Sequence, residues 1–289
     1  MKTFLIIDSH ALIYRFFHAL PPLTMPSGEP IGAIFGLARV ILKILKEQKP
    51  DYLAATFDRP EQTFRAKVFK DYKIQRPPAA PEIIGQFNKA RELFEVFGVK
   101  VVELAGYEAD DLIGTLVELF KKEPDLKIII LSGDLDTLQL VENDKVVVQF
   151  IKKGVSETEI YNEQAVFNRY GLAPKQLPDL KGLLGDASDN IPGVKGVGPK
   201  TATPLLKKYG SLENLLENLW EISDKIGNKL EGQKEIALFS KELAIIKRDA
   251  PIISRHLNDF RISAQNKPAI VNHLKSLGFN SIVTGFLAE

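Results

Sequence analysis

The sequence predicts an α/β fold with a mostly parallel, twisted sheet flanked by helices, followed by a helical C-terminal region. Short runs rich in Ile and Val alternate with amphipathic runs over residues 1–150, a pattern typical of buried parallel strands joined by helical crossovers. From about residue 155 the strand pattern stops, and short helical pieces separated by Gly and Pro follow. We therefore expect an α/β core over residues 1–155 and a helical region over residues 156–289.

Apolar runs predict the strands of the sheet, and the runs between them predict the helices. The expected strands are Thr3–Asp8, Asp51–Asp58, Val99–Leu104, Lys127–Asp134 and Lys145–Ile151. The expected helices are Gly32–Glu47, Glu82–Phe97 and Ala109–Lys122. Within Glu82–Phe97 the apolar residues recur three and four positions apart, which places them on one helical face.

The segment 63–81 fits neither pattern. Basic and aromatic residues alternate along it, and prolines close it. We interpret it as a mobile, basic connector, and the alternative is an ordinary solvated run of charges. Its basic residues include Arg65, Lys67, Lys73 and Arg76.

Helical pieces account for most of the second half. They are Glu163–Tyr170, Pro178–Leu184, Pro199–Tyr209, Leu212–Leu219 and Gly232–Arg248. From Pro251 onward the pattern is a mixture of strand and helix.

Composition excludes several classes of function. The chain of 289 residues is 45% hydrophobic and carries a net charge of +1, so a polyanionic partner needs a local basic patch. The absence of cysteine excludes disulfides, thiolate metal sites and cysteine nucleophiles. The four histidines are too scattered to predict a zinc site. No apolar run is long enough to span a membrane, and we expect a soluble, cytoplasmic protein.

Carboxylates recur where the predicted strands end. Because the carboxyl ends of parallel strands share one edge, these side chains should converge there. A single such acid is commonly a helix cap, but repetition at successive strands is harder to explain by capping. The candidates are Asp8, Asp58, Glu108, Asp110, Asp111, Asp134 and Asp136, with Asp186 and Asp189 further on.

Converging carboxylates repel one another, so they must share protons or bind cations. Oxygen ligands without His or Cys select hard ions, and we expect two or more Mg²⁺, with Mn²⁺ as a substitute. Two such ions form the clamp used for in-line displacement at phosphorus. Lys73 and Arg76 of the connector could then stabilise charge on the reacting phosphate.

A glycine-rich stretch, NIPGVKGVGPKT, spans residues 190–201. Pro199 breaks the Gly-Lys pair that a P-loop needs, so we interpret the stretch as a hairpin between two helices. Gly196 and Gly198 would let the backbone approach a phosphate, and Lys195, Lys200 and Thr201 lie beside them. This composition favours a sequence-independent contact with a duplex backbone, and a plain helix–helix turn is the alternative.

The motifs LIIDSH, TFD, GYEADD, SGDLD and GLLGDASDNIPGVKGVGPKTA together resemble the 5′-nuclease (flap endonuclease) superfamily. The similarity is greatest to the 5′→3′ exonuclease domain of bacterial DNA polymerase I and its free-standing relatives, and it extends over essentially the whole chain. It implies a PIN-like core and a helix–hairpin–helix element at residues 192–206. It also implies a clamp or arch in segment 63–81.

The resemblance also implies roles for individual residues. All nine acids named above would be ligands of two metal ions, Lys73 would be the active-site lysine with Arg76 close by, and Tyr72 would stack on a base. The hairpin would bind K⁺ through backbone oxygens. Arg65, Lys67, Lys195 and Lys200 would contact DNA.

The implied activity is cleavage of DNA with 5′ ends, flaps or branched junctions, some of it RNA-primed, to give 5′-phosphates during primer removal and repair. We expect a monomer. The alternatives are a PIN-like ribonuclease and a non-catalytic DNA-junction binder. A binder would not need nine repelling carboxylates beside a polyanion, and the hairpin argues against a simple PIN-like ribonuclease.

Overall fold

The computed structural model describes residues 1–153, 157–262 and 266–287. Its centre is one six-stranded sheet of order β3-β2-β1-β4-β5-β6. The first five strands are parallel and confirm the prediction. The strands are β1 (Lys2–Asp8), β2 (Tyr52–Phe57), β3 (Lys100–Glu103), β4 (Leu126–Ser132), β5 (Val146–Lys153) and β6 (Glu157–Tyr161).

Strand β6 was not predicted, and it runs antiparallel to β5 at the edge of the sheet. Its sequence ETEIY has a mostly exposed side-chain pattern and therefore lacks the apolar run that marks a buried strand. The expectation that strands stop at residue 155 was wrong for this reason.

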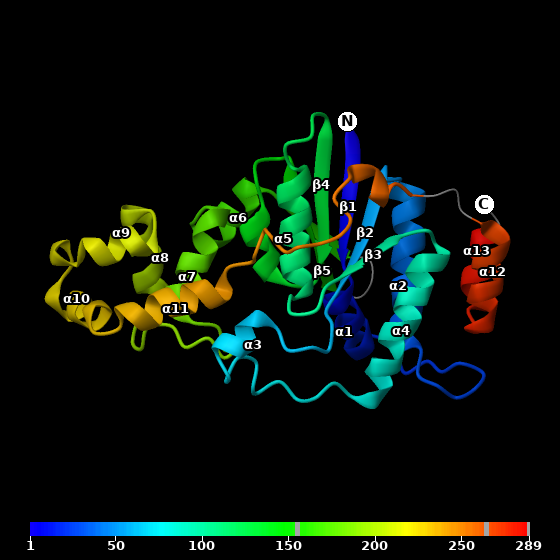
Figure 1. Ribbon diagram of the computed structural model, residues 1–289, viewed down its shortest axis with the longest axis horizontal. Coiled ribbons are helices and arrows are strands. Elements are labelled where there is room, and N and C mark those ends of the chain that lie inside the picture. The colour runs from blue at the N-terminus through cyan, green and yellow to red at the C-terminus, as the bar shows by residue number, and fades with distance from the viewer. Residues whose placement is uncertain (154–156, 263–265, 288–289) are drawn as a thin grey trace.

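Helices cover both faces of the sheet (Figure 1). Along β1, Phe4 and Ile6 point to one face, where α5 (Ala109–Phe120) packs, and Leu5 and Ile7 point to the other. That second face is covered by α1, α2 and α4, which span Ser9–Ala19, Gly32–Lys43 and Pro81–Val96. A π-helical turn, Ile44–Gln48, continues α2.

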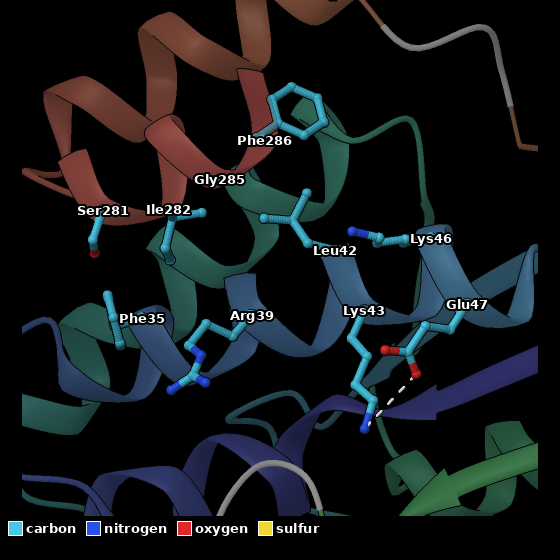
Figure 2. Close-up of a pocket in the computed structure, with 10 residues that line it drawn as sticks. All are labelled: Phe35, Arg39, Leu42, Lys43, Lys46, Glu47, Ser281, Ile282, Gly285 and Phe286. Carbon is cyan, nitrogen blue, oxygen red and sulfur yellow. Dashed lines mark ion pairs between the residues drawn. The ribbon is translucent and has the colours of Figure 1, made fainter. Parts of the chain in front are cut away.

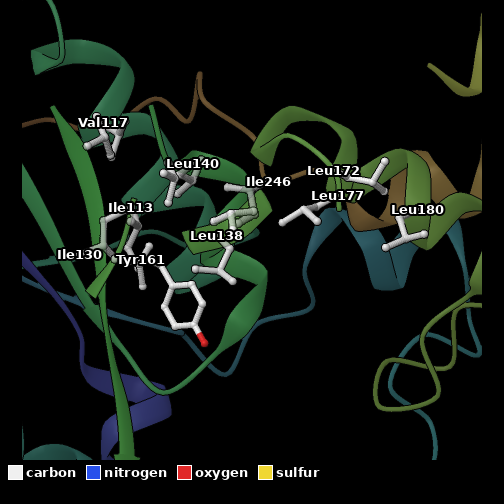
Figure 3. Close-up of a cluster of buried hydrophobic side chains, with 14 of the residues drawn as sticks. Ile113, Val117, Ile130, Leu138, Leu140, Tyr161, Leu172, Leu177, Leu180 and Ile246 are labelled. Atoms are coloured by element: carbon white, nitrogen blue, oxygen red, sulfur yellow. The ribbon is translucent and has the colours of Figure 1, made fainter. Parts of the chain in front are cut away.

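The helical region extends from the β6 side of the sheet (Figure 1). It contains α6 (Glu163–Tyr170), α7 (Leu177–Leu184), α8 (Pro199–Tyr209), α9 (Leu212–Glu217), α10 (Asp224–Glu231) and α11 (Lys234–Ala244). Short 3₁₀ turns occur at Leu135–Leu140 (η2), Pro174–Gln176 (η3), Leu219–Glu221 (η4) and Leu257–Phe260 (η5). One hydrophobic core runs without a break from Ile130 of β4 and Ile113 of α5 to Leu177 and Leu180 of α7 (Figure 3).

The last two helices lie at the opposite end of the molecule (Figure 1). The helices α12 (Lys267–Ser276) and α13 (Asn280–Leu287) pack with the core that contains α2 and α4. A groove separates α13 from α2 and is bordered by Arg39 and by Phe286 (Figure 2). The residues after 155 therefore pack in two separate places, so they are not one helical body.

Candidate active site

The carboxyl ends of the parallel strands meet at one edge of the sheet. There β1 lies between β2 and β4, so the chain leaves the centre of the sheet in both directions. Open α/β sheets bind ligands at such a switch point. A cavity of about 420 Å³ opens at this edge. Its acidic lining consists of Asp8, Asp58, Glu108, Asp110, Asp134, Asp136 and Asp189.

Several of these acids also cap the elements that carry them. Asp8 caps α1 by accepting from the Ala11 N–H at 3.1 Å, and its second oxygen accepts from the Ser132 hydroxyl. Asp134 caps η2 by accepting from the Asp136 N–H at 2.9 Å. Capping and convergence on the cavity are thus compatible, because Asp8 and Asp134 both cap their elements and line the cavity.

Burial and crowding make full ionisation of this cluster unfavourable. Burial, with added repulsion from Asp134 and Asp58, raises the pKa of Asp8 to about 7. Burial and Asp134 raise the pKa of Asp136 to about 6. The pKa of Asp110 is raised well above its ordinary value by burial and by Asp8. The site therefore favours binding of either protons or cations.

A second acidic group adjoins the cavity. Carboxylate oxygens of Asp136, Asp186 and Asp189 all lie within 4.8 Å of one another, an arrangement that could hold a metal ion. The Lys181 ammonium on α7 pairs with both Asp136 and Asp186. Burial opposes ionisation of Asp186, but Lys181 and Ser188 lower its pKa to about 2. Lys181 was missed in the sequence because its approach depends on the packing of α7 against η2.

Asp111 lies apart from the other acids. It is fully buried and does not line the cavity. Its carboxylate pairs with the Arg65 guanidinium, Nη1 to Oδ2 at 2.8 Å and Nη2 to Oδ1 at 2.8 Å. Arg65 is itself only 3% exposed. The sequence analysis expected it to contact DNA, but in the structure its side chain is buried. The helix α3 (Phe64–Val68) carries Arg65 at the start of the basic segment.

The rest of the basic segment lies against the acidic edge. The Lys73 Nζ atom is 3.0 Å from Glu108 Oε2, and Arg76 pairs with Asp189. Burial alone would lower the pKa of Lys73, but Glu108 and Asp189 raise it above its ordinary value. Both side chains line the cavity.

Tyr72 is placed differently from the prediction. It is 7% exposed, and its hydroxyl lies 3.1 Å from both Glu108 Oε2 and Asp189 Oδ2. In this structure the ring is not available to stack on a base. The Lys73 ammonium lies over its face, 4.9 Å from the ring centre. Lys67 is exposed.

The first helix contributes residues that the sequence analysis passed over. His10, Tyr14 and His18 are four residues apart on α1, and all three line the cavity. His10 stacks on Phe87 at 4.6 Å, and its Nε2 lies 3.4 Å from Asp58 Oδ2. The regular spacing of four was the signal that could have found them.

The glycine-rich stretch forms a hairpin between α7 and α8, as predicted. Gly193 has a φ of 63° and packs directly on the Gly185 backbone, where a Cβ would clash. Gly196 has a φ of 83°, a conformation that glycine adopts at little cost. Gly198 faces open space, since a Cβ there would meet nothing within 4 Å. The side chains at the tip are Lys195 and Lys200, both exposed, and the partly exposed Thr201.

Comparison with known proteins agrees with this geometry. A family model described as 5'-3' exonuclease, N-terminal resolvase-like domain matches residues 3–171, and one described as 5'-3' exonuclease, C-terminal SAM fold matches residues 172–268. The chain belongs to the 5′–3′ exonuclease family. The resemblance seen in the motifs is therefore confirmed.

Similar proteins of this family include one much longer than this chain and one of nearly the same length. DNA polymerase I of Bacillus subtilis is 41% identical over 283 residues, which cover 98% of this chain and 32% of that protein. A 5'-3' exonuclease of Aquifex aeolicus is 42% identical over 221 residues, covering 76% of this chain and 74% of that one. The chain thus spans about a third of the length of the polymerase that it matches.

Solved structures confirm the fold of this 5′–3′ exonuclease family member. T5 5'-exonuclease with bound zinc ions superposes with a TM-score of 0.69 and 19% identity, covering 99% of both chains. The catalytic core of Rad2 in complex with DNA substrate gives a TM-score of 0.64 and 18% identity, covering 98% of this chain and 92% of that one.

Proposed function

We propose that this chain is a divalent-metal-dependent, structure-specific 5′ nuclease that hydrolyses DNA phosphodiester bonds by a two-metal mechanism and leaves 5′-phosphates. The observation that supports it most is the single cavity on which seven carboxylates meet Lys73 and Arg76. A cluster so acidic would repel DNA unless cations neutralised it.

The donor set fits Mg²⁺, and Mn²⁺ as its substitute. All the acids offer hard oxygen donors, and burial together with neighbouring carboxylates raises the pKa values of Asp8 and Asp136, so a cation beside their ionised forms would be stabilising. The metal-holding residues would be the seven cavity acids and Asp186. Backbone oxygens of the hairpin at Gly196 would accept K⁺.

Divalent ions bound there would supply the charge that activates an attacking water and neutralises the leaving oxygen. The chain's own residues then orient the phosphate. Lys73 and Arg76 are held at the cavity by Glu108 and Asp189, and they would exchange these carboxylates for phosphate oxygens as negative charge develops. The hairpin lysines Lys195 and Lys200 would grip the duplex backbone without reading its sequence.

The proposed substrates are DNA 5′ ends, flaps and branched junctions, including RNA-primed strands, and the proposed roles are primer removal and repair. The structure contains no helix, in the part that it describes, that could span a membrane. We propose that the chain acts as a monomer in the cytoplasm. Catalytic core and helical region would act together, since one hydrophobic core joins them.

Two other functions are less well supported. A PIN-like ribonuclease would not explain the C-terminal SAM fold that matches residues 172–268. A non-catalytic junction binder would not explain why the acids converge instead of pointing away from DNA.

A 5′-flap duplex labelled at either end of the flap strand tests the proposal. Incubation with Mg²⁺ should release the flap near the junction with a 5′-phosphate on the remaining strand, and EDTA should abolish cleavage. Matched RNA and single-stranded oligonucleotides separate the nuclease from a ribonuclease. Tight duplex binding without any metal-dependent cleavage would favour the junction binder.

A further inference from the structure

The stretch 243–247 leaves the end of α11 and crosses to the α/β core, where buried polar side chains bind its backbone. Arg65 Nε donates to the Leu243 carbonyl at 2.9 Å, and Arg65 Nη2 donates to the Ile245 carbonyl at 2.7 Å. Asp111 Oδ1 accepts from the Lys247 N–H at 2.9 Å. One guanidinium–carboxylate pair therefore ties α3 and α5 to the end of α11.

A third side chain binds the same stretch from η2. Gln139 Nε2 donates to the Ala244 carbonyl at 3.1 Å, and its Oε1 accepts from the Ile246 N–H at 3.0 Å. Gln139 is 5% exposed, and Asp136 lies on the same short turn. We call residues 243–247, with Arg65, Asp111 and Gln139, the joint. It contacts two of the acid-bearing elements, because η2 carries Asp136 and α5 follows Glu108 and carries Asp110.

The carboxylate of Asp111 has no capacity left for a metal ion. It accepts two hydrogen bonds from Arg65, one from the Lys247 N–H and one from the Glu108 N–H at 3.1 Å. A carboxylate offers about four acceptor positions, and all are used. Its neighbour Asp110 faces the cavity instead.

Close packing adds to this polar network. Gly114 lies on α5 where a Cβ would stand 2.6 Å from the Ile246 side chain and 2.6 Å from the Lys247 carbonyl. Ile246 is buried among Leu138 and Leu140 of η2 (Figure 3). The joint can therefore reach α5 only because residue 114 has no side chain.

Residues just before the joint, in the last two turns of α11, support the hairpin. The Ser240 hydroxyl accepts from the Gly193 N–H at 3.0 Å, and Lys241 Nζ lies 2.6 Å from Asp179 Oδ1 on α7. A continuous set of contacts thus runs from the hairpin through α11 and the joint to the catalytic acids.

We propose that the joint couples the position of the helix–hairpin–helix to the geometry of the acids, with Arg65 and Asp111 as positioning residues and not as a DNA contact and a metal ligand. This inference rests on the proposed function, because it concerns the same cavity. Buried partners of this kind fix the orientation of metal-binding side chains without binding the metal themselves.

The test compares Arg65→Lys, Gly114→Ala and Asp111→Asn with the control Arg39→Lys, an exposed arginine on α2 remote from the cavity. Lysine keeps the positive charge but cannot donate the two parallel hydrogen bonds that the Arg65 guanidinium donates to Asp111. Arg65→Lys and Gly114→Ala should each lower the single-turnover rate on a 5′-flap duplex by about 10–100-fold, while the duplex Kd stays within about threefold. Gly114→Ala removes no polar group. If it lowers the single-turnover rate as much as Arg65→Lys does, the loss comes from the changed position of the joint and not from a lost charge.

Binding of Mn²⁺, followed by electron paramagnetic resonance without DNA, tests Asp111 independently of activity. Asp111→Asn should keep the wild-type number of bound ions, whereas Asp110→Asn should lose one. Loss of an ion in Asp111→Asn would overturn its assignment as a positioning residue. A weaker duplex Kd with an unchanged rate in Arg65→Lys would make Arg65 a DNA contact. If wild-type protein binds Mn²⁺ but does not cleave, the proposed function fails while the Asp111 assignment stands.

Discussion

Substitution of Asp8 by Asn should stabilise the metal-free protein at neutral and alkaline pH. Asp8 is 2% exposed, and burial raises its pKa from the ordinary 3.8 to about 7. The folded state therefore binds this proton more tightly than the unfolded state. The stability that the protonated Asp8 carboxyl contributes is fully present below pH 3.8 and is lost as the pH rises through about 7.

The size of this change in the free energy of unfolding follows from the shift in the pKa of Asp8. At 1.36 kcal/mol per pKa unit, the ionised Asp8 costs about 4 kcal/mol at pH 8. Asparagine keeps the cap on the Ala11 N–H but must reorient Ser132, so we expect a net gain of about 2 kcal/mol. For a chain of this size that gain raises the melting temperature by about 3 °C.

Thermal melts of both proteins in EDTA, from pH 5 to pH 9, measure this difference. The difference in melting temperature between Asp8→Asn and wild type should be small at pH 5 and widen as the pH rises. The control variant Asp249→Asn, at an exposed acid, should show no such trend. Saturating Mg²⁺ should reverse the order, since an ion at 100 times its Kd stabilises wild type by about 2.7 kcal/mol. A variant that melts at or below the wild-type temperature at pH 8 in EDTA would refute the conclusion that ionised Asp8 destabilises the metal-free fold.

Three further substitutions address separate parts of the site. Asp134→Ala should reduce flap cleavage by roughly a thousandfold and leave duplex binding mostly intact; substantial Mg²⁺-dependent cutting would contradict the two-metal proposal. Lys73→Ala should lower kcat by about 10–100-fold with little change in KM, and a change in KM alone would make it a docking residue. Lys200→Ala should weaken all duplexes alike and reduce the slope of log K against log salt by about 1, and a change in sequence preference would argue against backbone-only contact.

The sequence by itself determined the parallel strands of the sheet and the edge at which the acids gather, but not the antiparallel strand β6. Alternating strands and helices force parallel pairing, and parallel strands place their carboxyl ends together. Asp8, Asp58 and Asp134 lie at such ends or within two residues of them, so their convergence needed no knowledge of distant contacts. The hairpin was equally local, because its glycines and the flanking helices are contiguous.

Only the tertiary structure decided which member of each motif faces the cavity. Asp110 and Asp111 are adjacent on a helix, where successive side chains point about 100° apart. Which of them turns inward is set by Arg65 and by the Lys247 N–H, which come from distant parts of the chain. The burial of Tyr72 likewise depends on the fold bringing Glu108 and Asp189 together around its hydroxyl. Local pattern fixes the kind of side chain at a position, whereas its direction depends on partners that only folding brings into contact.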